Sequence, residues 1–155
     1  MSGPKYDKHY KAKPPFRQVE GIESPVWDQL TPHAVWCLLE LYRKFYGNNR
    51  YDLSLTRGDV KHKMSPPTLT KSIWELIAFG FIDRLRWGYL EKKCSIYGLS
   101  HRWKKIGNSP QNIKSIKRLL IQIEEVSRNK KDENKKYKVR AMQNKILRIG
   151  GHPLW

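Results

Sequence analysis

The chain has 155 residues, a length that suits one globular domain with extensions. Its formal net charge of +17 and its pI near 10.0 indicate a polyanionic partner, nucleic acid first and an anionic membrane surface second. No apolar run approaches the about 20 residues that cross a bilayer, and the N-terminus lacks the apolar segment of a secretory signal. We therefore expect a cytoplasmic, nucleoid-associated protein without a membrane partner.

Positive charge is concentrated toward the end of the chain. Residues 111–155 carry 12 Lys or Arg against 4 Asp or Glu. Residues 1–15 are polar, basic and contain proline, so we predict a flexible basic N-terminal arm there. We expect a folded domain over residues 16–107 and a basic helical extension over residues 108–155.

The segment LTPHAVWCLLELYRKFY predicts the first helix of the domain. Thr31 can cap its start, and Pro32 occupies the first helical position, where its missing N–H has no intrahelical partner. Apolar residues then recur at helical spacing, and GNN ends the helix because Gly47 favours a left-handed cap. The alternating segment YDLSL that follows predicts a short strand.

Two further helix starts come next. In TRGDVKHKM, Thr56 and Asp59 have the spacing of a capping box. In MSPPTLTKSIWELIAFGFI, Ser65 is a good N-cap, and the two prolines after it remove only N–H groups that have no partner in the first turn of a helix. We predict that these prolines start a helix, that its buried stripe is Leu69, Ile73, Leu76 and Ile77, and that Gly80 ends it.

The rest of the chain predicts a hairpin and more helix. GFIDRLRWGYLEKKCSIYGLS has two strand-like runs around a basic tip. Beyond it, Ile113 to Val126 form an apolar stripe at helical spacing. This stripe could form a homodimer interface or dock on the chain's own domain. The charge run from Lys130 to Arg140 could be a solvated face or a second nucleic-acid-binding segment.

The predicted elements follow the order of a winged helix-turn-helix: helix, short strand, helix, turn, helix and basic hairpin. The fold class we predict is therefore mainly α with a small β-hairpin, a winged helix-turn-helix domain plus a C-terminal helical extension. The helix that starts at Ser65 is long enough to enter a major groove, with its N-terminal half toward the base edges.

The stretch from Phe16 to Gly107 resembles small winged-helix proteins of bacterial prophages and plasmids. The resemblance is carried by a block of the form SPxWxxLTPxAxxxLxxLxxxFxGxNN and by a second block, SxxTxxKxIxELxxxGFI. The second block is shared with many winged-helix replication initiators and transcriptional regulators. The resemblance implies double-stranded DNA binding, with the turn MSPPT and the long basic extension as departures from the family pattern.

The rotation of the helix selects candidate DNA contacts. With the apolar stripe inward, the outward side chains that we expect in or near the groove are Pro67, Thr68, Thr70, Lys71 and Trp74. Basic side chains of the preceding helix and of the β-hairpin, which is the wing of this fold, are candidate phosphate contacts: Arg57, Lys61, Lys63, Arg84, Arg86, Lys92 and Lys93. We expect a sequence-specific double-stranded DNA-binding protein, a transcriptional regulator of phage or plasmid type.

Other functions have weaker support. The spacing of Cys37, Cys94 and the histidines does not suit a metal site, and we expect Cys37 in the core and no cofactor. No glycine-rich phosphate loop, nucleophile elbow or paired catalytic carboxylates are present, so we expect no enzyme. The alternatives are a replication initiator or accessory protein, or a scaffold whose winged helix binds proteins.

Overall fold

The computed structural model describes residues 19–88 and 93–153. This part is mainly helical with a small two-stranded antiparallel sheet, which confirms the predicted fold class. The described elements, in chain order, are the short 3-10 helix η1 (Trp27–Gln29), α1 (Pro32–Lys44), α2 (Arg57–Val60), α3 (Pro66–Ala78), β1 (Ile82–Arg86), β2 (Ile96–Leu99), α4 (Arg102–Gly107), α5 (Pro110–Arg128) and α6 (Lys135–Gly150). The predicted arm over residues 1–15 lies outside the described residues.

Helix α1 begins and ends close to where its sequence predicts. The Thr31 side chain accepts a hydrogen bond from the Ala34 N–H, and Pro32 is the first helical residue. Cys37 lies in the core as expected, and burial raises the pKa of its thiol to about 11. Of the predicted strand after α1, Leu53 alone forms a β-bridge, with Tyr97 of β2.

Helices α2 and α3 are the second and third helices of the predicted order, and a short turn joins them. The Asp59 carboxylate accepts a hydrogen bond from the Thr56 N–H, and the Thr56 side chain accepts from the Asp59 N–H, which are the two bonds of the predicted capping box. Helix α3 starts at Pro66, so both prolines do occupy its first positions. The predicted inward stripe of α3 is buried in full: Leu69, Ile73, Leu76 and Ile77.

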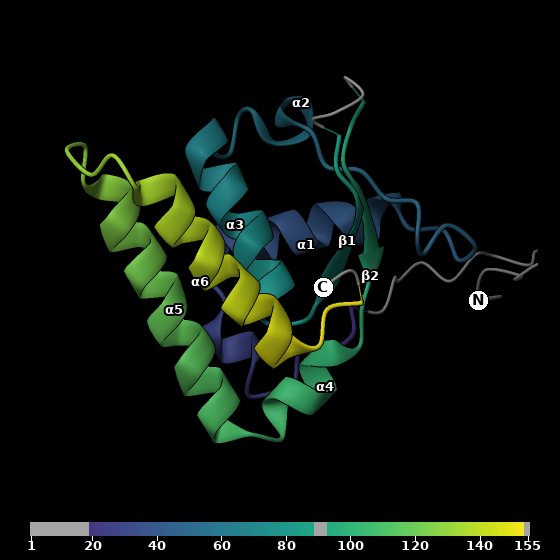
Figure 1. Ribbon diagram of the computed structural model, residues 1–155. Helices are drawn as coiled ribbons and strands as arrows, with labels where there is room; N and C mark the ends of the chain where they lie inside the picture. Colours follow the sequence, from purple (N-terminus) through teal and green to yellow (C-terminus); the bar gives the residue numbers. More distant parts are fainter. Residues whose placement is uncertain (1–18, 89–92, 154–155) are drawn as a thin grey trace, which may run out of the picture.

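The hairpin β1–β2 packs behind α3. Ile82 pairs with Leu99 and Arg84 with Tyr97, with an irregularity in the register between Arg84 and Arg86. The two strands run beside α3 and rise toward the end of the molecule that carries α2 (Figure 1).

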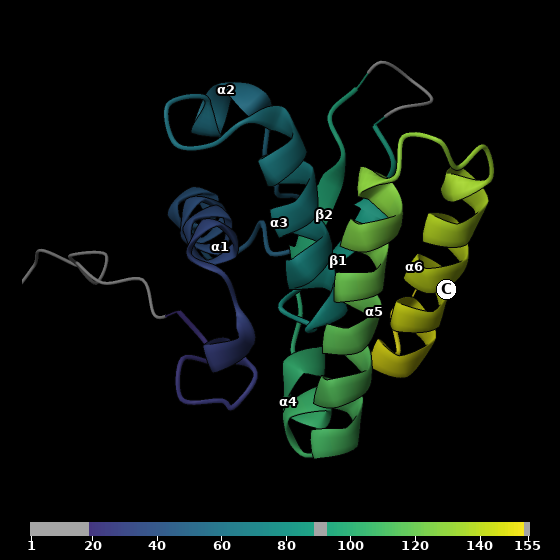
Figure 2. The same cartoon turned by 90° about the vertical axis from the view of Figure 1, so that its left-hand side faces the viewer.

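Helices α5 and α6 form an antiparallel pair that packs on the domain. Ile116 of α5 and Ile146 of α6 have no exposed surface, and both helices contact α4, while α6 also contacts α3. Figure 2 shows the pair side by side, next to α3 and the sheet. Docking of the α5 stripe on its own domain is thus observed. Homodimerisation through that stripe stays a prediction, with less apolar surface left for it.

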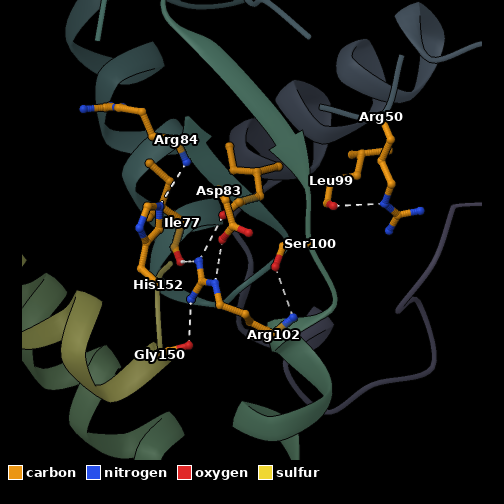
Figure 3. Close-up of polar contacts among 10 residues, drawn as sticks. Arg50, Ile77, Asp83, Arg84, Leu99, Ser100, Arg102, Gly150 and His152 are labelled. Atoms are coloured by element: carbon orange, nitrogen blue, oxygen red, sulfur yellow. Dashed lines mark hydrogen bonds and ion pairs between the residues drawn. The ribbon is translucent and has the colours of Figure 1, made fainter. Parts of the chain in front are cut away.

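One arginine joins the end of α6 to the domain. Arg102 of α4 donates from Nε to Asp83 Oδ1 (2.6 Å) and from Nη1 to the Gly150 carbonyl (2.9 Å). Its Nη2 donates to the carbonyls of Ile77 and Ile82. Figure 3 shows the guanidinium at the centre of these contacts. The C-terminal pair is therefore fixed to the end of α3 and to the start of β1.

Candidate nucleic-acid interface

The outward side of α3 is exposed over its first two turns. Pro66, Pro67, Thr70 and Lys71 are exposed, whereas Thr68 is half-buried. The Thr70 hydroxyl donates to the Pro66 carbonyl (3.2 Å), and the Ser65 and Thr68 hydroxyls lie 2.9 Å apart. Four of the five candidates on this helix, Pro67, Thr68, Thr70 and Lys71, therefore form or border one strip of its N-terminal half, the exposed strip of α3.

Lys71 is held by the C-terminal extension. Its Nζ lies 2.9 Å from Glu124 Oε2 of α5, and the other oxygen of that carboxylate is 2.6 Å from Arg128 Nη2. The Lys71 ammonium is the main cause of a lowered pKa of Glu124. The side chain of Lys71 is still 55% exposed, so an anion can approach it from solvent.

The fifth candidate, Trp74, is half-buried and packs against the core. The Arg84 guanidinium lies 5.0 Å from its ring and 4.2 Å from the ring of Trp87. Arg84 therefore stacks among aromatic rings, an arrangement that favours a cation. Burial lowers the pKa of Arg84, and its Nε is buried without a hydrogen-bond partner in the described structure. Arg84, predicted as a phosphate contact, is largely withdrawn from the surface.

The wing keeps other basic groups at the surface. Arg86 and Lys93 are exposed, and Arg86 Nη2 donates to the Cys94 carbonyl (3.1 Å). Lys92 lies outside the described residues. Trp87 is 56% exposed, and its ring lies 4.2 Å from the Arg84 guanidinium.

Helix α2 and the turn after it supply basic groups on the other side of the α3 strip. Arg57, Lys61 and Lys63 are all exposed. Arg57 and Lys61 line a shallow groove together with Pro66 at the start of α3. Lys63 Nζ lies 4.6 Å from the centroid of the Trp36 ring, so it is partly engaged with α1.

These groups gather at one end of the molecule. Two perpendicular views show four segments at the upper end of the molecule: helix α2, the start of α3, the distal part of the hairpin and the turn between α5 and α6 (Figures 1 and 2). Helix α4 lies at the opposite end. The structure thus brings together the predicted contacts of α2, α3 and the wing, except for the half-buried Trp74 and Arg84 and for Lys92, which lies outside the described residues.

Two charged residues at this site have roles that sequence reasoning missed. Glu75 is 5% exposed and accepts hydrogen bonds from the N–H (2.6 Å) and hydroxyl (2.9 Å) of Thr31. Burial raises the pKa of Glu75. Glu124 of α5 pairs with Lys71, and no local pattern in the sequence indicates this pair. Both contacts join residues far apart in the chain, so no spacing rule reveals them.

The arrangement can bind an anionic backbone. Among residues 19–88 and 93–153, no three His, Cys, Asp or Glu side chains gather to hold a metal ion. The helices in the same ranges include none that is both long and apolar enough to cross a membrane.

Comparison of the chain with protein-family models, with curated proteins and with solved structures found no match.

Proposed function

We propose that this chain binds double-stranded DNA and inserts the first two turns of α3 into the major groove. The observation that carries the proposal is the exposed strip of α3, with basic groups of α2 along one edge, Lys71 at the other edge, and further basic groups of the wing at the same end of the molecule. A net charge of +17 supplies the long-range attraction to a polyanion.

The dimensions of a helix and a groove support this mode of binding. A helix with side chains is about 10–12 Å wide, and the major groove of B-DNA is about 12 Å wide. A helix in the groove is bordered by two phosphate strands, so basic groups are useful on both sides of it. Arg57 and Lys61 stand beside α3 on one side, and Lys71 stands at its other edge.

Sequence preference would come from the exposed strip. The Lys71 ammonium can donate to guanine O6 and N7, and the Thr70 hydroxyl can bond several base edges. Pro67 offers an apolar surface to a thymine methyl group. The two prolines remove N–H groups that often bind phosphate at a helix start, so side chains would carry the recognition. Sequence-specific binding of this kind fits a transcriptional regulator or a replication initiator.

One observation favours a second function, a protein-binding scaffold. Helix α1 exposes Trp36 (38%) and Leu39 (43%), two large apolar side chains on its outer surface. Such residues are enriched in protein interfaces when they cluster. A scaffold would not need the exposed strip of α3, so a measurement of DNA binding distinguishes the two functions.

A fluorescence titration of the full chain into a labelled duplex of about 20 base pairs, at about 50 mM salt, tests the proposal. We expect saturable binding, and selection from a random duplex pool should then enrich one motif. Binding without an enriched motif would reject sequence specificity while keeping DNA binding. Absence of binding at this salt would reject the proposal and favour the scaffold.

A further inference from the structure

We propose that the turn between α5 and α6 is a second DNA-backbone contact, on the side of α3 away from α2. The chain would then hold both phosphate strands that border the groove occupied by α3. This inference rests on the proposed function and extends it, because it assigns a role to the C-terminal extension.

The turn is strongly basic and exposed. Between Arg128 and Lys138 the chain has six basic and two acidic residues. One of the acids, Asp132, is already engaged: its Oδ2 lies 2.6 Å from Lys138 Nζ, and that hydrogen bond is the main cause of its lowered pKa. Lys130 and Lys131 are exposed, and within the described residues neither has a carboxylate partner. Two ammonium groups at the tip are thus available to an external anion.

The turn also has a defined shape. Asn129 Oδ1 accepts from the Lys131 N–H (3.1 Å), and Asp132 Oδ1 accepts from the Asn134 N–H (2.9 Å). Side-chain bonds of this type to the backbone two residues on stabilise a turn. Less conformational entropy is therefore lost when the turn meets a rigid surface.

Its position relative to α3 follows from a chain of ion pairs. Glu124 bridges Lys71 and Arg128, so the last turn of α5 lies directly beside the exposed strip of α3. At the other edge of the strip, Arg57 and Lys61 line one groove together with Pro66. In Figures 1 and 2 the turn lies at the same end of the molecule as α2 and the start of α3. A duplex whose groove holds α3 would present one phosphate strand to α2 and the other to this turn.

The salt dependence of DNA binding tests the inference. Each phosphate contact adds about 0.9 to the slope of log K against log salt. The double variant K130A/K131A should therefore reduce the slope by about 1.8, which corresponds to roughly 60-fold weaker binding at about 0.1 M salt when the affinity at 1 M salt is unchanged. The matched control is K105A/K114A, which removes two exposed lysines from α4 and from the early part of α5, at the other end of the molecule. The control should leave the slope nearly unchanged.

The outcomes separate the two proposals. If the wild type binds duplex DNA and K130A/K131A has the same slope as the control, the turn is a solvated surface and this inference is overturned, while the proposed function stands. A wild type that binds no duplex overturns both. A slope change seen only with duplex RNA also overturns the DNA-backbone role. K130R/K131R, which keeps the charge, should keep the slope, and equal melting temperatures would show that all variants are folded.

Discussion

Lys71 of α3 and Glu124 of α5 form an ion pair, with 2.9 Å between Nζ and Oε2, although 53 positions separate them in the chain. The carboxylate occupies the position that a DNA phosphate would take against the same ammonium. In the proposed complex, a phosphate or base edge therefore competes with Glu124 for Lys71. Under the proposed function, the C-terminal extension would both support the interface and limit its affinity.

Glu124→Gln should strengthen duplex binding. The amide has no negative charge to hold Lys71 and Arg128, so both cations are free to meet DNA. Exposed ion pairs contribute about 0.2–1 kcal/mol, which corresponds to an affinity gain of up to about fivefold. Glu125→Gln is the matched control, because Glu125 is the next residue of α5 and is exposed. Equal gains in the two variants would mean that net charge alone acts.

Lys71→Ala should weaken duplex binding about five- to tenfold, because it removes a groove contact. The free energy of unfolding should change by less than about 1 kcal/mol, since the ion pair with Glu124 is exposed to solvent. Titration and chemical denaturation measure the two effects separately. Lys145→Ala in α6, also exposed, is the control for loss of one charge. A stability loss with unchanged affinity would place Lys71 outside the interface.

The contribution of His152 to the stability of the fold should decrease as the pH falls below about 6.5, the ordinary pKa of histidine. His152 is buried, and its Nε2 accepts a hydrogen bond from the Arg84 N–H (3.0 Å), which requires an unprotonated nitrogen. Burial and the charges of Arg102 and Arg84 lower its pKa, against an opposing effect of Asp83. The unfolded chain therefore takes up a proton at higher pH than the native one, so acidification favours unfolding.

Melting temperatures between pH 8 and pH 5 check this expectation. His152→Gln keeps a possible acceptor and cannot titrate, so its melting temperature should depend less on pH in this range. The lowered pKa of Glu20, which is paired with His101, acts only below about pH 4.5 and falls outside the window. Parallel pH profiles for the wild type and His152→Gln would contradict the assignment.

Gly80→Ala should lower the free energy of unfolding by at least about 2 kcal/mol. Gly80 has φ of +79°, and an added Cβ would lie 2.6 Å from the Trp103 backbone nitrogen. Gly151→Ala is the control, since Gly151 has φ of +65° but no heavy atom within 4 Å of its Cβ position. That change should cost about 1–2 kcal/mol from the backbone alone. Equal losses in denaturant titrations would show that the contact with α4 is unimportant.

Local signals in the sequence predict most of the helices. Thr31 with Pro32, and Ser65 with its two prolines, mark helix starts because unpaired N–H groups are a short-range requirement. The Thr31 hydroxyl caps α1, whereas Ser65 stands at the predicted N-cap position of α3 without a side-chain capping bond. The inward stripe of α3 follows in the same way from periodicity. Helix α6 was harder to predict, since the charge run at its start conceals both the end of α5 and the turn before it.

The candidate site was predicted less completely. The exposure of Thr70 and Lys71 follows from the buried stripe, whereas the withdrawal of Arg84 depends on Trp74 and Trp87 meeting across the fold. The burial of Glu75 depends on Thr31, 44 positions away. Charge and spacing identify which side chains face outward on one element. They do not identify which of them another element will cover.

The salt dependence of duplex binding by the wild-type chain tests the central claim most directly. Binding constants measured from about 50 to 200 mM salt should give a straight line of log K against log salt with a slope of about −4 or steeper. That slope corresponds to at least four or five phosphate contacts, as expected for basic groups on both sides of α3. No measurable binding at the lowest salt, or a slope near zero, would contradict the account.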